Sequence, residues 1–471
     1  MDQQFVDREL ELKFLEERYR ESSPQLIIVY GRRRIGKTEL LLRFARDKPH
    51  VYFLCERTNM RSNIFKMSLR MAKYLNRDSF SRIEFRDWED LFVEFLEWKG
   101  GEKVIIIVDE FPYLIELNKG VISEFQRIWD EHVSKRMDVM LVLCGSSVGM
   151  METEVLGYRS PLYGRRTGQW KVGELNLGSV WKFIPSYPLK EVIYTYGALG
   201  GVPAYLIKLN SKLSFHENVK RLVLSKEGVL YEEAENLLRQ ELREPRNYTM
   251  ILRALSEGKR RVTEIAKEIG MDRAAVSRYL DVLEALDIVG YETPLLERPK
   301  TRKRFYYIKD NYFNFWFRYV YPNKDLIEEG KGDLVIEELA KDYDTYIGPV
   351  YERIIRSLIY ELNLPFIISR SGRHWGKTGK GEAYEIDILA HDRDKRNFLL
   401  LEVKWSDLTF KDALRILHSL EENAEKAGIY GKLYYGIVGR HISMKEKLRK
   451  KGYTAIDLKD IEKSLKKVPK P

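Results

Sequence analysis

The segment that most constrains this chain is a glycine-rich loop between an apolar strand and a helix. The strand is expected over residues 26–30 and the helix over residues 39–44, and the loop reads Gly-Arg-Arg-Arg-Ile-Gly-Lys-Thr. Glycines let the backbone turn so that its N–H groups converge on phosphate oxygens at the positive end of the helix. The pattern therefore predicts a P-loop that binds a nucleoside triphosphate. The expected nucleotide-binding residues are Gly31, Arg32, Arg33, Arg34, Ile35, Gly36, Lys37 and Thr38.

Phosphate chemistry also needs a cation, a hydroxyl and carboxylates. Lys37 is expected to reach the β- and γ-phosphates, and the Thr38 hydroxyl to bind phosphate-bound Mg²⁺. A second apolar run, residues 104–108, ends in Asp109 and Glu110. Acids at the carboxyl end of a parallel strand lie where open α/β sheets bind ligands. We expect Asp109 to orient the metal's ligands and Glu110, as the catalytic base, to polarise the attacking water.

A third apolar run, residues 139–144, ends in Gly145, Ser146 and Ser147. Its end places small polar groups at the same expected edge of the sheet. Ser146 or Ser147 could sense the γ-phosphate. A turn that simply ends the strand explains the same residues equally well.

These motifs and several further segments together resemble the archaeal ATPase family, whose relatives include AAA+ and STAND-type ATPases. The matching segments cover roughly the first half of the chain: residues 5–9, 31–38, 109–110, 145–147, 162–166 and 200–205. The resemblance implies an adenine pocket lined by Val6, Arg8 and Pro203. It also implies that Arg165 or Arg166 neutralises charge on the γ-phosphate. A solvated basic loop is the alternative for these two arginines.

Length, charge and cysteine content favour an intracellular protein of several domains. The chain has 471 residues and a net charge of +10, which is compatible with a polyanionic partner. Cys55 and Cys144 lack metal-ligand spacing and fall in expected strands, so we expect core residues. No apolar run approaches the ~20 residues of a membrane span, and the N-terminus is unlike a signal peptide. We therefore expect a cytoplasmic protein that contacts no membrane.

Short helices with tight turns follow residue 245. One helix ends at Gly270, and Asp272 can cap the next, which runs through Leu286. Two β-like pieces around the basic segment 297–304 follow, as in a winged helix. The second helix of such a domain enters the DNA major groove, and a basic wing contacts phosphates. The expected DNA contacts are Arg273, Ser277, Arg278, Lys300, Arg302, Lys303 and Arg304. The alternative is a lid or a protein-docking module.

The last third of the chain holds a second group of acidic residues with a lysine. Residues 384–390 and 398–405 are expected to be strands joined by a polar turn. A period of two places Glu402 and Lys404 on one face, and a hairpin would bring Asp387 beside them. Two carboxylates beside a lysine can hold a divalent metal and stabilise charge on a phosphodiester.

This arrangement resembles the PD-(D/E)xK nuclease superfamily, although Ile386 replaces the proline of its motif. The resemblance implies catalytic roles for Asp387, Glu402 and Lys404, with Glu352 of the preceding helix as an added metal ligand beside Asp387 and Glu402. The segment from residue 306 also resembles a C-terminal domain that accompanies archaeal ATPases. Acids that interrupt buried strands are costly unless they are functional. Cleavage and an inert nuclease-like fold both remain open.

Arg373, His374 and Trp375 precede the first acidic strand. Trp375 could stack on a base and Arg373 could bind phosphate, while a capped edge of the core explains them equally well.

We therefore expect an α/β protein of four parts: a P-loop ATPase core with a parallel sheet (1–170), a helical lid (171–240), a winged helix-turn-helix (241–305) and a restriction-endonuclease-like α/β domain (306–471). The leading hypothesis is an ATP- and Mg²⁺-dependent hydrolase that binds DNA and couples a nucleotide switch to a metal-dependent nuclease-like domain. The alternative is an ATP-switched regulator or scaffold that binds DNA or a partner protein, with an inert nuclease-like domain. A homo-oligomer is compatible with either.

Overall fold

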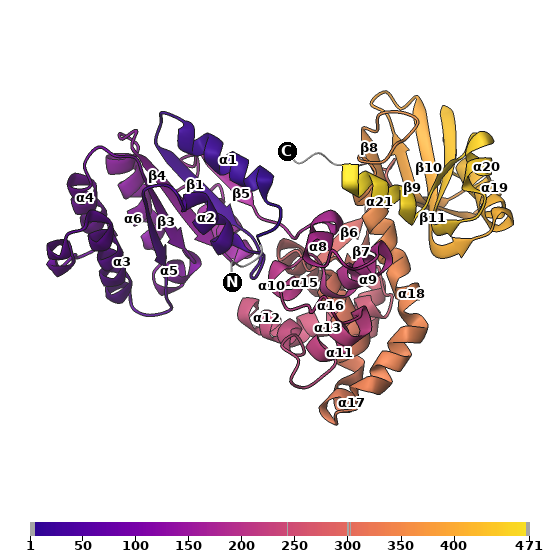
Figure 1. Cartoon of the computed structure of the whole chain (residues 1–471), viewed down its shortest axis with the longest axis horizontal. Helices are drawn as coiled ribbons and strands as arrows, with labels where there is room; N and C mark the ends of the chain where they lie inside the picture. The colour runs from indigo at the N-terminus through magenta and orange to yellow at the C-terminus, as the bar shows by residue number, and fades with distance from the viewer. Residues whose placement is uncertain (1–4, 243, 299–300, 302, 468–471) are drawn as a thin grey trace. The chain divides into compact units, whose positions relative to one another are not determined.

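The computed structural model describes residues 5–242, 244–298, 301 and 303–467 (Figure 1). The chain divides into two units. The first holds Met1–Leu175 and Val202–Ile207, and the second holds Asn176–Gly201 and Lys208–Pro471. Residues 171–240, for which the sequence predicts a helical lid, therefore fall partly in the first unit and partly in the second. Within the described residues, no helix has the length and apolar character needed to span a bilayer.

The core of the first unit is a five-stranded sheet whose neighbouring strands are all parallel. The strands are β1 (Gln25–Tyr30), β2 (His50–Leu54), β3 (Val104–Asp109), β4 (Val139–Gly145) and β5 (Gly168–Lys171), in the order β2-β3-β4-β1-β5. Every residue of β1, β3 and β4 is buried, so both faces of these strands are covered. The parallel sheet predicted from the apolar runs is confirmed.

Helices cover both faces of this sheet because alternate strand residues point in opposite directions. Ile27 shares an apolar cluster with Leu40 of α2, whereas Ile28 belongs to the cluster of Met67 from α3. The helices and turns of this unit are α1 (Glu9–Arg20), α2 (Lys37–Ala45), α3 (Met60–Leu75), η1 (Asp78–Arg82), α4 (Trp88–Trp98), α5 (Pro112–Leu117), α6 (Val121–Arg127), η2 (Ile128–Val133), α7 (Val148–Met150), η3 (Met151–Val155) and α10 (Pro203–Leu206).

The second unit begins with helices and a small hairpin. Its helices up to the C-terminal sheet are α8 (Leu177–Phe183), α9 (Leu189–Leu199), α11 (Phe215–Leu222), α12 (Glu233–Glu241), α13 (Pro245–Ser256), α14 (Val262–Ile269), α15 (Arg273–Ala285), α16 (Asn311–Phe315), η4 (Trp316–Val320), η5 (Tyr321–Asn323), α17 (Lys324–Glu328) and α18 (Gly332–Leu358). The Asp272 carboxylate accepts the N–H groups of Ala274 and Ala275, so it caps α15 as the sequence predicts. The antiparallel pair β6 (Val289–Glu292) and β7 (Phe305–Ile308) follows α15.

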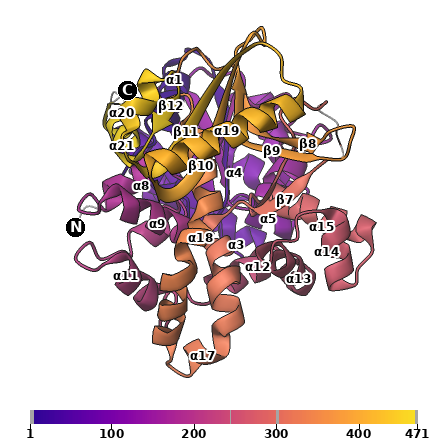
Figure 2. The same ribbon diagram turned by 90° about the vertical axis from the view of Figure 1, so that its right-hand side faces the viewer.

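The C-terminal part of this unit is a mixed five-stranded sheet in the order β12-β11-β10-β9-β8. The strands are β8 (Arg370–Lys377), β9 (Ala383–His391), β10 (Asn397–Leu408), β11 (Lys432–Ile442) and β12 (Thr454–Ile456), with helices α19 (Phe410–Ala427), α20 (Lys445–Lys450) and α21 (Leu458–Lys467). Strands β8, β9 and β10 form an antiparallel meander, and β11 pairs in parallel with β10 and β12. Helix α19 connects β10 to β11 and lies across the sheet (Figure 2).

Candidate functional site

Two glycines give the loop after β1 its shape. Gly31 has φ 152°, and a Cβ atom there would lie 2.3 Å from the carbonyl oxygen of Val172. Gly36 has φ 87° and immediately precedes α2, so the loop turns directly into a helix N-terminus. Both positions need a residue without a side chain. The loop expected to bind phosphate thus has the strand, turn and helix that a P-loop requires.

The lysine and the hydroxyl of this loop contact defined partners. The Lys37 ammonium donates to the carbonyl of Arg32 at 2.9 Å. The Thr38 hydroxyl donates to Oδ2 of Asp109 at 2.7 Å, and the Tyr52 hydroxyl donates to the same oxygen at 3.0 Å. A hydroxyl beside a carboxylate is an oxygen donor set that suits Mg²⁺. The structure therefore brings the two predicted metal-binding groups of the ATP site together.

Glu110 and Ser146 also lie side by side. The Ser146 hydroxyl donates to Oε2 of Glu110 at 2.6 Å, and its backbone N–H approaches the same oxygen at 3.3 Å. Glu110 itself has φ 54°, and its N–H donates to Asp109 Oδ1 at 2.9 Å. The predicted base is thus held by the predicted phosphate sensor, a contact that the sequence does not reveal.

The residues expected to line an adenine pocket have different surroundings. The buried Arg8 guanidinium donates to the carbonyls of Ile35 and Gly173 at 3.0 and 2.8 Å and pairs with Glu11 at 2.9 Å. These contacts tie Arg8 to the P-loop at Ile35 and to the segment after β5 at Gly173, and its place in an adenine pocket stays a prediction. Pro203 does lie on the loop, since a Cβ atom at Gly36 would be 3.9 Å from its Cγ atom. Val6 is half-buried in the segment before α1.

The two arginines expected near the γ-phosphate differ in their contacts. Arg165 pairs with both carboxylate oxygens of Asp130, at 2.7 and 2.9 Å, and donates to the carbonyl of Pro161. Arg166 lies over the Tyr163 ring, and its buried Nη1 atom has no hydrogen-bond partner among the described residues. Arg165 is therefore engaged with Asp130, and the role of either arginine at the γ-phosphate stays a prediction.

The residues expected to contact DNA divide between α15 and the segment before β7. Arg273 and Arg278 are exposed on α15, and Ser277 is half-buried. Lys303 pairs with Glu297, and Arg304 lies over the Tyr291 ring at 4.3 Å. Lys300 and Arg302 lie outside the described residues.

The C-terminal acids meet where β9 and β10 stop forming a regular ladder. Leu401 pairs with Ile388, which places Asp387 opposite Glu402. Oδ2 of Asp387 accepts the N–H of Val403 at 2.9 Å in place of a backbone carbonyl. The Lys404 ammonium lies 2.6 Å from Glu402 and 3.6 Å from Asp387. The hairpin thus brings the three residues together, as the period of two suggests.

Glu352 of α18 belongs to the same group of charges. Burial and the negative charge of Asp387 raise the pKa of Glu352 to about 7, against the effect of nearby cations. Burial and Asp387 likewise raise the pKa of Glu402 to about 7. Burial would lower the pKa of Lys404, but Asp387 and Glu402 raise it overall, so the lysine stays charged. Crowded carboxylates of this kind suit a divalent cation, which would relieve their repulsion.

Three further charged residues surround these acids: Arg356, Arg373 and Glu292. The sequence pointed to Arg373 as a candidate phosphate-binding residue but not to Arg356 or Glu292. Arg356 of α18 pairs with Glu292 of β6 and approaches the backbone carbonyl of Asp387 at 3.4 Å. Arg373 of β8 pairs with Glu385 and lies 3.7 Å from Glu292. The hairpin of the helix-turn-helix region is therefore linked by ion pairs to the acid cluster. Only the tertiary structure brings these residues together, and no local pattern indicates it.

Family comparisons agree with this arrangement. Residues 5–209 match the ATPase domain found predominantly in Archaea. Residues 249–291 match the bacterial regulatory protein, arsR family, and residues 316–416 match a family described as archaea bacterial proteins of unknown function. The chain thus contains an ATPase domain and an arsR-type winged helix-turn-helix.

Three individual proteins illustrate these matches. An uncharacterized protein of Methanocaldococcus jannaschii is 39% identical over 451 residues, which cover 94% of this chain and 97% of that protein. An uncharacterized ATP-binding protein of the same organism is 52% identical over 44 residues, 9% of this chain and 75% of that protein. Among solved structures, a Walker-type ATPase of Pyrococcus abyssi superposes with a TM-score of 0.52 at 21% identity, covering 67% of this chain and 96% of that one. This last likeness concerns the fold.

Proposed function

The chain belongs to the archaeal ATPase family, and we propose that it hydrolyses ATP and uses the nucleotide state to control a metal-dependent nuclease acting on DNA. Two groups of residues support this proposal. One is the P-loop with Asp109 and Glu110, and the other is the cluster of Glu352, Asp387, Glu402 and Lys404 in the second unit.

In the ATP site, Lys37 would bind the terminal phosphates, while Thr38 and Asp109 would hold Mg²⁺. Bound Mg²⁺ would neutralise charge on the phosphates. Glu110 would orient the attacking water once its carboxylate is free of the Ser146 hydroxyl, which lies 2.6 Å away. A γ-phosphate that competes for Ser146 would release Glu110, so hydrolysis would begin only when ATP is in place.

The nuclease proposal depends on one observation: Lys404 lies within ion-pair distance of both Glu402 and Asp387, on a strand that packs against α18. The order α18, β8, β9, β10, α19, β11 supports a restriction-endonuclease-like fold for this domain. Asp387, Glu402 and Glu352 would hold a divalent metal that lowers the pKa of its bound water. Lys404 would stabilise negative charge on the phosphodiester during attack.

Separate substitutions in the two sites test the proposal. We expect Lys37→Ala to abolish ATP hydrolysis, because the terminal phosphates lose the lysine ammonium that would bind them. We expect Lys404→Ala and Asp387→Ala to abolish nicking of supercoiled plasmid in Mg²⁺ or Mn²⁺ while ATP hydrolysis continues. Exposed Lys411→Ala serves as a matched control and should behave like the parent.

Two outcomes would count against the nuclease. Equal nicking by the parent and Lys404→Ala would exclude the proposed catalytic cluster. A parent protein that binds DNA with a steep salt dependence but does not nick it, with or without ATP, would favour the regulator with an inert nuclease-like domain.

A further inference from the structure

A cavity of about 970 Å³ lies in the second unit between the helix-turn-helix region and the first strands of the C-terminal sheet. Its walls come from α14, α15, β7, β8 and β9, which lie near one another in Figure 2. Among the described residues that line it, five are lysine or arginine and one, Glu385, is acidic. A cavity of this charge would bind a polyanion.

Aromatic rings line the same cavity. Phe305 of β7 and Trp375 of β8 stack with ring centroids 4.6 Å apart and an angle of 11° between their planes. The guanidinium of Arg261 lies 5.1 Å from the centre of the Phe305 ring. Both stacked rings remain partly exposed. Aromatic faces within a basic groove bind unpaired bases by stacking, and base pairing in a duplex hides those faces.

The position of β8 argues against a duplex in the usual place. Arg273 and Ser277 of α15, which a helix-turn-helix would insert into a major groove about 12 Å wide, line this cavity together with β8 and β9. Because the Phe305 and Trp375 rings join the two regions, a duplex lying on α15 would also have to accommodate β8. A single strand meets no such obstacle.

The cavity also leads toward the acid cluster. Glu385 lines the cavity and lies two residues before Asp387 on β9, about 7 Å along the strand. Arg373 pairs with Glu385. Burial would lower the pKa of Arg373, but nearby acids, which include Glu385, Glu352 and Asp387, raise it overall. The Arg373 guanidinium, paired with Glu385, therefore lies between the cavity and the acids, a separation of about two nucleotides of a strand.

We propose that this cavity binds a single-stranded nucleic acid segment and presents its backbone to the cluster of Asp387, Glu402 and Lys404. The inference rests on the proposed nucleic-acid function and specifies its substrate as an unpaired strand. The Trp375 face that does not contact Phe305 would stack on a base, with Phe305 supporting the indole from its other side. Arg273 and Lys377 would contact phosphates.

Binding in EDTA tests this inference independently of cleavage. Fluorescence anisotropy would compare a labelled DNA strand of mixed sequence, its blunt duplex and the matching RNA strand, with the full-length protein. We expect the single strand to bind at least about tenfold more tightly than the duplex. We expect Trp375→Ala to weaken single-strand binding about tenfold, and Lys377→Gln to reduce the salt dependence of binding.

Matched controls separate binding from folding. Tyr430→Ala removes an exposed ring outside the cavity, and Lys380→Gln removes an exposed charge three residues from Lys377. Both should bind like the parent. Because Lys377 is exposed, its substitution tests the cavity even if Trp375→Ala fails to fold. Binding of the RNA strand as well would extend the substrate to any unpaired polynucleotide and support the inference.

Two results would overturn the inference: a duplex that binds as tightly as the strand, or Trp375→Ala and Lys377→Gln proteins that bind the strand like the parent. Single-strand binding without metal-dependent cleavage would contradict the nuclease proposal and leave this one standing. Cleavage of duplex by a protein that shows no preference for single strands would support the nuclease proposal and contradict the single-strand inference.

Discussion

At the scale of single residues, Gly31 shows how strictly the P-loop is shaped. Its φ is 152°, and a Cβ atom added to it would lie 2.3 Å from the Val172 carbonyl oxygen, which leaves no room for alanine. The obstructing atom belongs to the backbone that continues β5, so no side-chain rotation can relieve the clash. The loop and the edge of the sheet would have to separate.

We therefore expect Gly31→Ala to weaken ATP binding by more than about tenfold and to destabilise the fold by about 1–3 kcal/mol. Titration with a fluorescent ATP analogue and thermal denaturation would measure the two effects. Gly101→Ala is the matched control, since a Cβ atom there meets nothing within 4 Å. Unchanged ATP binding by Gly31→Ala would show that the loop is less constrained than the structure indicates.

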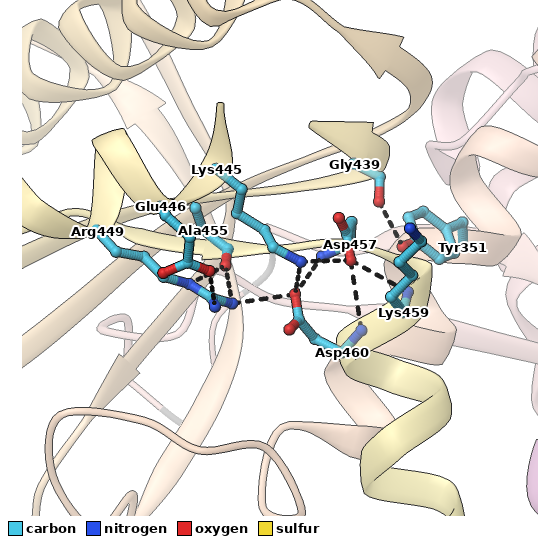
Figure 3. A network of polar contacts seen from close by, with 9 residues as sticks. All are labelled: Tyr351, Gly439, Lys445, Glu446, Arg449, Ala455, Asp457, Lys459 and Asp460. Carbon is cyan, nitrogen blue, oxygen red and sulfur yellow. Dashed lines mark hydrogen bonds and ion pairs between the residues drawn. The ribbon is translucent and has the colours of Figure 1, made fainter. Parts of the chain in front are cut away.

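At the scale of elements, α21 is attached to α20 by a network of charges (Figure 3). The Lys445 ammonium lies 2.7 Å from Asp457 and 2.6 Å from Asp460, and Arg449 lies 3.0 Å from Asp460. Burial alone would raise the pKa of Asp460, but hydrogen bonds from Lys445, the Asp457 N–H and Arg449 lower it to about 2. The last helix is thus held by a carboxylate that must stay ionised.

A folded pKa of about 2 gives a pH dependence of known sign. The contribution of the Asp460 carboxylate to the free energy of unfolding is complete above its unfolded pKa of about 3.9. That contribution is lost as the pH falls through the folded pKa of about 2. After allowance for partial exposure, we expect Asp460→Asn to cost about 1–2 kcal/mol at pH 7 and the difference from the parent to shrink between about pH 4 and pH 2. Urea denaturation at several pH values would measure it.

The control for this experiment is Glu462→Gln, which removes an exposed ion pair with Lys466 on the same helix. It should change the free energy of unfolding by less than about 0.5 kcal/mol at any pH. A pH-independent difference between Asp460→Asn and the parent would mean that packing, and not ionisation, holds α21.

At the scale of the whole molecule, α9 connects the neighbourhoods of the two sites along the chain. Tyr194 of α9 donates to Asp344 of α18, which also accepts the indole N–H of Trp405 at 2.8 Å. Trp405 directly follows Lys404. A few residues after α9 the chain enters Val202–Ile207, which belongs to the first unit and contains Pro203. The chain itself thus connects the helix that contacts Asp344 with the segment that contains Pro203.

We expect Asp344→Ala to retain ATP hydrolysis and to lose the effect of ATP on the second unit. Hydrogen exchange of β10 amides should respond to ATP in the parent and not in the variant, because the Tyr194 and Trp405 contacts that could differ between nucleotide states are gone. The control is Asp342→Ala, which lies on the same helix as Asp344 and removes a contact with Arg318 of η4. A full ATP response in Asp344→Ala would exclude this route of coupling.

Features that depend on near neighbours in the chain could be predicted from the residues alone. A glycine pattern between a strand and a helix specified the P-loop, apolar runs ending in acids predicted the parallel sheet, and a period of two placed Glu402 and Lys404 on one face of a strand. Such features follow from local backbone geometry, so a short stretch of residues is enough to predict them.

The distant partner of each charged side chain became known only from the folded chain. Arg8 binds the backbone of the P-loop, Arg165 pairs with Asp130, and Glu292 of the wing hairpin reaches Arg356 beside the acid cluster. A chain with this many charges offers each arginine many carboxylates. Burial and packing select one of them, and no local periodicity records that selection.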